Sequence, residues 1–485
     1  MLREAARRPI PGANDERAPP SVNPVSDSDA AQSPDGPALF RFVEELLPMR
    51  RCVTGAGLRE TLLAIGERVP LRITEVASGT AVLDWTVPRE WHVRDAYLAV
   101  GGRRVLDWAD HALHLVQYSV SVRDAMPLWA LRAHLHTLPD QPDLVPYRTS
   151  YYAPAWGFCL SHNALGRLAE EIGEHGEVEV VIDANHADGS LTYGEVVVPG
   201  ETPDEILVSA HACHPALAND NASALAVATA LARRLLDGPA LRHSVRVLFA
   251  PGTVGAIAWL DRNHAGLDRI RHGLVLANLG DGGGFTYKRS RRGTLDAPLA
   301  VDAAVETVMR DRGLGLDVRS FSPTGYDERQ FGSPGFDLPV GRLTRTPHGE
   351  YPEYHTSGDN LSLVRPAALA ESLDVIEQVV RTVDADRRYR NTQPFGEPQL
   401  GRRGLYATVG GAAWGPEAQR ALQWVLNLSD GRHSLLDIAG RSGLPFETLR
   451  AAADRLLETD LLVEEPGATP DGDGALDPAL LRTSP

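Results

Sequence analysis

Apolar residues form three continuous runs in the middle of the chain, at 205–211, 244–252 and 272–281. Each run is typical of a strand that is buried on both faces. The segments that follow the first two runs, 222–236 and 253–263, carry apolar residues at helical spacing. This alternation predicts an α/β domain whose sheet contains parallel strands with helices on both faces. Ligands of such sheets bind beyond the carboxyl ends of the strands, so the chemistry is expected at that edge.

The part before these runs has a different pattern. Residues 72–195 largely alternate between apolar and polar positions, with turn sequences of Gly-Gly at 101–102 and Asp-Gly at 188–189. They predict a mostly β subdomain. We expect it to be inserted into an α/β domain that comprises residues 37–71 and 196–390.

The last part of the chain predicts a separate small unit. After a Pro- and Gly-rich link at 391–404, residues 400–466 have the apolar spacing of three helices and a short strand, which is typical of a winged helix. The two ends, 1–36 and 467–485, lack hydrophobic periodicity, and we expect them to be disordered tails.

Charge and composition narrow the range of partners. The chain of 485 residues has 48 basic and 64 acidic side chains, a net charge of −16, which argues against a nucleic-acid partner. Between 402 and 465 the count is seven arginines against nine acidic residues, so packing or dimerisation is favoured over DNA binding. Three scattered cysteines, no apolar leader and no long apolar run predict a cytoplasmic protein without a membrane partner.

Metal-ligand residue types occur at or near the predicted strand ends. His211 ends the first run and is followed by His214 and Asp220 in the string HACHPALAND, and Asp281 ends the third run. His355 lies further on, in EYPEYHTSGDN. Imidazole nitrogens and carboxylate oxygens are ligands that zinc and similar ions prefer. Two structural roles stay open, because Asp220 could cap the helix that follows it and Asp281 could close a Gly-rich turn.

The strings HACHPALANDNAS, GDGGGFTYKRSRRG and DERQFGSPGFDLPVG, together with the one around His355, resemble a bacterial aminopeptidase-like family. That family is related to zinc exopeptidases such as leucyl aminopeptidases and glutaminyl cyclases. The resemblance covers about residues 38–390 and extends into the winged helix. It implies a mixed sheet flanked by helices.

The resemblance also implies one or two zinc ions or other divalent ions and a set of site residues. The implied metal ligands are His211, Asp220, Asp281 and His355, with Asp220 as the bridge between two ions in dinuclear members. Asp359 is implied as the residue that orients the last histidine. Asp327 falls where relatives have a residue near the substrate.

The sequence departs from the family pattern at two places. Relatives have a pair of glutamates after the second strand, one acting as general base and the other as metal ligand, whereas positions 250–253 here read Ala-Pro-Gly-Thr. Relatives also have an aspartate at the position of Cys213. The missing glutamates put a two-metal site in question. They also require another base, for which Glu328 and Glu353 are the candidates.

Three further residues are candidates for contact with the substrate: Asp327, Tyr351 and Trp156. Donors to a developing oxyanion could be Tyr351, Tyr354 or His214. The predicted function is metal-dependent hydrolysis of an amide bond by an aminopeptidase-like enzyme that acts on a small peptide or amide metabolite, in a chain that could form homo-oligomers. Two alternatives remain, a non-catalytic relative that binds a small molecule or a partner, and a winged-helix regulator.

Overall fold

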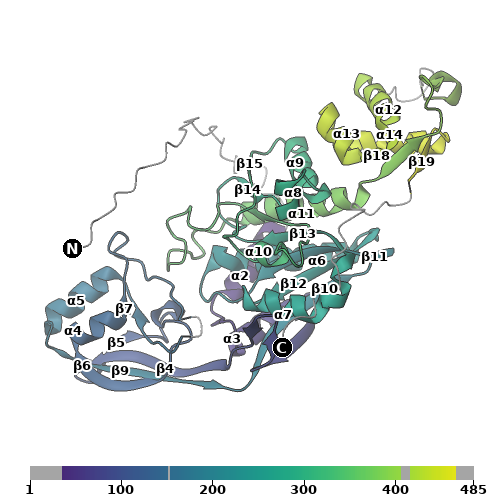
Figure 1. Ribbon diagram of the computed structural model, residues 1–485. Helices are drawn as coiled ribbons and strands as arrows, with labels where there is room; N and C mark the ends of the chain where they lie inside the picture. Colours follow the sequence, from purple (N-terminus) through teal and green to yellow (C-terminus); the bar gives the residue numbers. More distant parts are fainter. Residues whose placement is uncertain (1–34, 151–152, 406–414, 466–485) are drawn as a thin grey trace, which may run out of the picture.

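The computed structural model describes residues 35–150, 153–405 and 415–465. An eight-stranded mixed sheet lies at its centre (Figure 1). The strands, in their order across the sheet, are β1 (Arg72–Ala77), β10 (Ser190–Val198), β12 (His243–Ala250), β11 (Thr202–His211), β13 (Ile270–Leu276), β16 (Val340–Thr344), β14 (Phe285–Lys288) and β15 (Leu316–Arg319). Strands β12, β11, β13 and β16 are parallel neighbours, so their carboxyl ends lie at one edge. The predicted α/β class and mixed sheet are confirmed.

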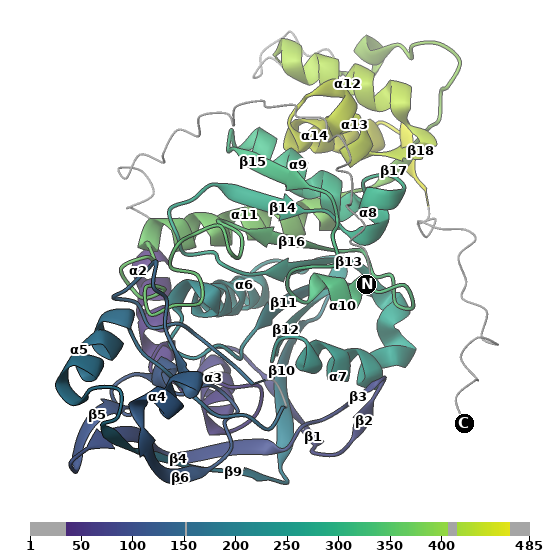
Figure 2. The same ribbon diagram turned by 60° about the vertical axis from the view of Figure 1, so that its left-hand side comes forward.

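Helices cover both faces of this sheet (Figures 1 and 2). They are α2 (Asp35–Leu46), α3 (Ala56–Gly66), α6 (Ala224–Asp237), α7 (Val254–Asn263), α8 (Arg291–Leu295), α9 (Ala300–Asp311), α10 (Glu328–Phe331) and α11 (Pro366–Ala385). Neighbouring residues of one strand enter different apolar clusters: Ile206 and Val208 pack with α6 and α11, whereas Leu207 packs with α7. The continuous apolar runs of the sequence therefore reflect burial on two faces.

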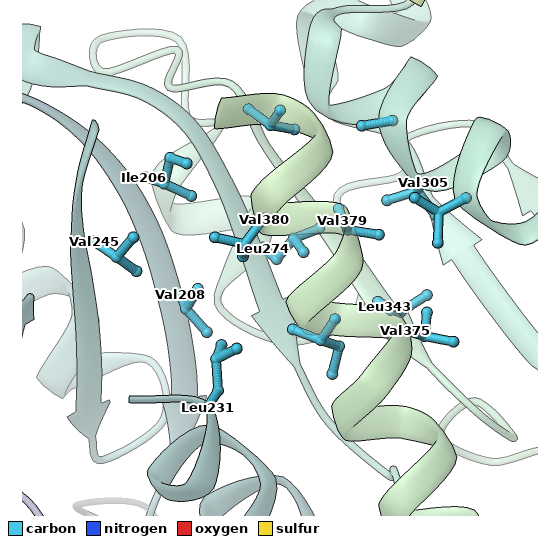
Figure 3. Packing of buried hydrophobic residues seen from close by; sticks show 14 of the residues in the cluster. Ile206, Val208, Leu231, Val245, Leu274, Val305, Leu343, Val375, Val379 and Val380 are labelled. Carbon is cyan, nitrogen blue, oxygen red and sulfur yellow. The ribbon is translucent and has the colours of Figure 1, made fainter. Parts of the chain in front are cut away.

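The larger of the two clusters fixes α11 against the strands. Figure 3 shows Val375, Val379 and Val380 of α11 beside Leu274 and Leu343 of the sheet. This packing anchors the long helix that follows the loop containing His355.

A second sheet forms the inserted subdomain, in the order β5 (Arg103–Asp107), β4 (Glu90–Val100), β9 (Glu177–Ala187) and β6 (Val122–Pro127). Other elements of this part are β2 (Ala81–Val82), β3 (Trp85–Thr86), α4 (Leu128–Leu131), β7 (Leu135–His136), β8 (Phe158–Cys159) and α5 (His162–Ile172). Gly101 and Gly102, both with positive φ, form the β4–β5 hairpin turn that the sequence predicts.

The insert is shorter than the predicted 72–195. Strands β1 and β10 pair with each other, and β10 also pairs with β12, so both belong to the central sheet. The Asp-Gly turn at 188–189 therefore joins strands of two different sheets instead of closing a hairpin. Alternation of apolar and polar residues indicates a strand but not the sheet to which the strand belongs.

The winged helix consists of α12 (Pro416–Leu428), β18 (Asp430–Ser434), α13 (Leu435–Ser442), α14 (Phe446–Glu458) and β19 (Leu462–Glu464). It also includes β17 (Arg388–Asn391), the middle strand of the order β18-β17-β19, so the unit begins before the predicted residue 400. Figure 2 shows it resting beside α8 and α9. Of the predicted tails, 1–34 and 466–485 lie outside the described residues, while Asp35 and Gly36 belong to α2. In the described ranges, no helix has the length and apolar character that a membrane span requires.

Candidate metal centre

His211 and His355 meet at one carboxylate, that of Asp220. His211 is the last residue of β11, and its Nε2 atom lies 2.9 Å from Asp220 Oδ1. His355 lies in the loop before α11, and its Nε2 atom lies 3.0 Å from Asp220 Oδ2. Both imidazoles therefore contact the same side chain, although they are far apart in the sequence.

Asp220 is fully buried and ionised. Its side chain is 0% exposed. Burial opposes ionisation, but His214, His211 and His355 together hold the pKa of this carboxyl well below its ordinary value. Asp359 accepts hydrogen bonds from the backbone N–H groups of Asn219 (2.5 Å) and Asp220 (3.0 Å). Asp359 therefore holds the backbone of the loop that carries Asp220.

A third imidazole, that of His214, completes the group. Ligand atoms of His211, His214 and Asp220 all lie within 4.8 Å of one another. The ring of His214 lies 4.8 Å from that of His211 and 5.2 Å from that of His355, measured between centroids. Burial lowers the pKa of His214 to about 3, so this ring is neutral and can offer a lone pair at ordinary pH.

His211, His214 and Asp220 have the ligand types and the spacing of a site for a divalent ion such as zinc, and His355 lies at the other oxygen of Asp220. Tetrahedral zinc with bonds of about 2.0–2.1 Å separates its ligand atoms by about 3.3 Å, close to the two distances between the histidines and Asp220. Within the described ranges, no second cluster of three or more such side chains lies beside this one. The loop at 250–253 offers no side-chain carboxylate. The structure therefore gathers one group of three ligand side chains, with His355 facing the second oxygen of its carboxylate.

The structure does not bring Asp281, a predicted ligand, into this group. Its Oδ1 atom accepts from Gly283 N and Thr346 Oγ1, both at 2.7 Å, and its Oδ2 atom accepts from Asn219 Nδ2 at 2.9 Å. Strand β13 ends at Leu276, five residues earlier, so Asp281 lies within the Gly-rich loop and closes it. This is the structural role that the sequence left open.

Of the two predicted bases, Glu328 is committed to a buried ion pair. Its side chain is 0% exposed and lies 2.5 Å from Lys288 Nζ and 3.5 Å from Arg342 Nη1. The carboxylate of Glu353 makes no hydrogen bond or ion pair with His355 or Asp220, and its Cβ and Cγ atoms lie against Gly358. Neither glutamate is placed at the metal-ligand group.

Asp327 is the carboxylate that reaches the loop where relatives have their glutamates. Its Oδ1 atom accepts from Thr253 N at 2.8 Å. The residue before Thr253 is Gly252, which lies directly beside Cys213 and His211. A Cβ atom built on Gly252 would be 3.4 Å from the Cys213 Sγ atom and 3.8 Å from the His211 Cβ atom. Burial raises the pKa of Asp327 to about 6. The sequence singled out Asp327 as a substrate contact, not as a base.

The other predicted contact residues have different surroundings. The Tyr351 hydroxyl donates to Asp359 Oδ2 at 3.0 Å and thus supports the Asp220 loop. The Trp156 ring stacks on His134 in the insert, with 3.6 Å between centroids. The ring that lies on His211 is Tyr326, at 4.9 Å, and Tyr354 stacks on His355 at 3.9 Å. The sequence does not identify Tyr326 as a site residue, because its only signal is its place next to Asp327.

The fold and the position of the site at the carboxyl ends of β11 and β13 define an aminopeptidase-like α/β protein with a carboxyl-terminal winged helix. The chain belongs to the family described as a domain of unknown function, DUF4910, whose model matches residues 40–386. A winged helix-turn-helix model matches residues 387–464.

Two results concern Clostridium acetobutylicum. A protein of that organism, provisionally named a polysaccharide biosynthesis protein with an aminopeptidase-like domain, is 44% identical over 431 residues, which are 89% of this chain and 97% of the relative. A crystal structure from the same organism, provisionally called a peptidase, has a TM-score of 0.81 at 42% identity and covers 89% of this chain and 96% of its own.

More distant solved structures share the fold. The zinc aminopeptidase of Bacillus subtilis has a TM-score of 0.54 at 14% identity, covering 71% of this chain and 94% of its own. A peptidase M28 precursor from Shewanella amazonensis has a TM-score of 0.53 at 14% identity, covering 73% and 94%. These similarities support the predicted family resemblance and fold.

Proposed function

We propose that this protein is a metal-dependent hydrolase of amide bonds that uses one divalent ion. The observation that carries the proposal is the carboxylate of Asp220, whose two oxygens lie 2.9 and 3.0 Å from imidazole nitrogens of His211 and His355. The ion would be held by His211, His214 and Asp220, and His355 would support the site from the other oxygen of Asp220. When bound, such an ion polarises a carbonyl group and lowers the pKa of water to about 7.

In this proposal Asp327 is the general base that takes a proton from the attacking water. Its Oδ1 atom is fixed by Thr253 N, which aims the carboxylate at the loop beside His211. Its raised pKa of about 6 keeps it basic enough to accept a proton and ionised near pH 7. Glu328 cannot act in this way while it is paired with Lys288.

The substrate class follows from amide chemistry and from a relative. An aminopeptidase-like fold suggests an aminoacyl amide or a small peptide as the substrate. The name of the relative from Clostridium acetobutylicum, which mentions polysaccharide biosynthesis, suggests a second class, an amide of a sugar such as an N-acylated amino sugar. Both classes have the scissile carbonyl that the proposed chemistry needs.

The test combines metal analysis and turnover on the full chain. We expect about one ion per chain by elemental mass spectrometry, because the structure gathers one group of ligand side chains. His211→Ala and His355→Ala should lose the ion, whereas His162→Ala, an exposed histidine of the insert, should retain it. Leucinamide, a dipeptide and N-acetylglucosamine then serve as substrates.

Each outcome has a definite meaning. Turnover of any of these amides that disappears with the ion supports the proposal. An unchanged metal content in both site variants would remove the proposed metal centre. Metal binding without turnover of any amide would refute the proposed enzymatic activity and favour the non-catalytic alternative.

A further inference from the structure

The inserted subdomain contacts the metal-ligand group through one side chain, that of Tyr147. This residue lies in the segment between β7 and β8, and it is buried. The centroid of its ring lies 5.2 Å from that of His214 and 5.0 Å from that of His355. A tyrosine of the insert therefore packs against two of the histidines that lie around Asp220.

Backbone hydrogen bonds join the same part of the insert to the loop that carries His355. Tyr147 N donates to His355 O at 2.7 Å. Two residues away on each segment, Ser357 N donates to Val145 O at 2.8 Å, and Val145 N donates to Ser357 Oγ at 3.0 Å. The residues between these pairs form an antiparallel bridge. The two segments therefore run side by side as a short ladder.

This ladder is important because His355 has an unfavourable backbone conformation. Its φ is +54°, in the left-handed region that residues with a Cβ atom seldom adopt. Such a conformation persists only where the surrounding contacts impose it. The carbonyl group of His355 is held by Tyr147 N, so the insert supplies one of these contacts.

His214 is connected to the same tyrosine through a chain of buried side chains. The Tyr147 hydroxyl donates to Gln117 Oε1 at 2.8 Å, and Gln117 Nε2 donates to the backbone carbonyl of Arg51. The Arg51 Nε atom in turn donates to His214 O at 2.7 Å. All three supporting side chains are buried, so water competes little for these bonds.

We propose that Tyr147 is a positioning residue of the metal centre, so that the insert completes a site whose ligands come from the α/β domain. This inference rests on the metal centre proposed above. The ring restricts the two imidazoles, the backbone N–H fixes the His355 loop, and the hydroxyl fixes the segment behind His214. Residues that orient the ligands of a metal typically change its affinity about 10–100-fold when they are replaced.

The test measures binding of Co²⁺ to the full chain by visible absorption, which reports the geometry of the ligands as well as the affinity. We expect Tyr147→Ala to weaken binding about tenfold or more and to change the spectrum, because both imidazoles gain freedom. Tyr147→Phe keeps the ring and loses only the hydroxyl bond, so it should recover most of the affinity and the spectrum. Tyr193→Ala is the matched control, because this tyrosine of β10 is also buried and interacts with Thr74 and Arg262 instead.

The outcomes separate this inference from the proposed function. Absence of Co²⁺ binding by the unmodified chain would overturn both. Binding by the unmodified chain with the same affinity and spectrum in Tyr147→Ala would overturn the positioning role alone. Equal weakening in Tyr147→Ala and Tyr193→Ala would also overturn it, because the loss would then follow from general destabilisation.

A thermal unfolding transition in each variant shows that it is folded. If Tyr147→Ala does not fold, Tyr147→Leu takes its place, because leucine keeps an apolar side chain in the small cluster around residue 147. The same loss of affinity and change of spectrum are expected for Tyr147→Leu, since it lacks the aromatic ring and the hydroxyl. An unchanged affinity and spectrum in Tyr147→Leu would equally overturn the positioning role.

Discussion

Asp327 and Glu328 are neighbours in the sequence, yet the fold gives their carboxylates opposite roles. Glu328 opens α10 and points to Lys288, the one lysine of the chain, in a pair with no exposed surface on the glutamate. Asp327 lies one residue earlier and turns to the loop beside His211. The first arrangement suits stability, because a buried charge requires a partner. The second suits proton transfer.

Substituting each residue by its amide should separate these roles. We expect Asp327→Asn to lower kcat about 100-fold or more without changing metal content, because the amide still accepts from Thr253 N but cannot take a proton. Glu328→Gln should instead destabilise the chain by about 3 kcal/mol, since Lys288 loses its counter-charge. Steady-state kinetics and urea denaturation of both variants measure the two effects. Equal kcat in Asp327→Asn and the unmodified chain would exclude Asp327 as the base.

Residue chemistry could be predicted where a strand end fixes the position. His211 ends β11 and Asp220 follows it closely, so both could be assigned to the carboxyl edge from the sequence. Asp281 could not be assigned in this way, because the apolar run continues past the end of β13 and hides where the strand stops. Asp327 could not be identified as a base, because its contact with Thr253 joins segments that are distant in the sequence.

At the scale of elements, α13 of the winged helix shows how one helix start depends on two domains. Ser434 and Asp437 form a capping box in which each side chain accepts from the other's backbone N–H. Asp386, which precedes the winged helix, accepts from Leu436 N at 2.9 Å. Burial raises the pKa of Asp386 to about 7. The carboxyl group therefore keeps its proton in the folded chain at a pH where an unfolded chain has lost it.

This shift predicts a pH-dependent stability. Below about pH 4 the carboxyl is protonated in both states, and its contribution is fully present. As the pH rises to about 7, the unfolded state releases the proton first, so this contribution is progressively lost. Asp386→Asn should therefore gain stability relative to the unmodified chain over this range. We expect a gain of about 1–2 kcal/mol, because solvent reaches part of this half-buried side chain and reduces the effect. Urea denaturation between pH 4 and 8 measures the difference. A difference that stays constant with pH would contradict the prediction.

The strands of the central sheet could be predicted from the sequence, but their order across the sheet could not. The runs at 205–211, 244–252 and 272–281 correspond to β11, β12 and β13, because burial on both faces leaves a continuous apolar signal. The order of strands across the sheet was not predictable. Strand β14 comes before β16 in the chain but pairs on its far side, and only long-range contacts decide such an order.

At the scale of the whole molecule, the two ends of the parallel strands face different parts of the chain. The metal-ligand group lies beyond the carboxyl ends of its parallel strands, as expected for open α/β sheets. The winged helix lies near the amino ends of these strands, across a cavity that is lined by Asp204 and His272. The winged helix packs against α9 of the larger domain.

The position of the winged helix depends on the last turn of α9. Arg310 donates from Nη1 to Ala439 O and from Nη2 to Leu444 O, both at 3.1 Å, at the carboxyl end of α13. Asp311 accepts from Phe446 N at 2.8 Å, at the start of α14. A cation at a helix carboxyl end and an anion at a helix amino end each match the helix dipole. Two adjacent residues of one domain thus hold two helices of the other.

Removal of the Arg310 guanidinium should release the winged helix without unfolding the larger domain. We expect Arg310→Ala to cost about 2 kcal/mol of docking free energy, since two hydrogen bonds to carbonyl groups are lost. Trypsin should then cleave the link at Arg402 or Arg403 about tenfold faster, because cleavage follows the population of the open form. Arg312→Ala is the matched control, because the side chain of this exposed arginine, two residues further on, donates to Gln378 of α11 and to no described residue of the winged helix. Equal cleavage rates in the two variants would mean that Arg310 does not hold the domains together and that the apolar contact between α9 and α13 is sufficient.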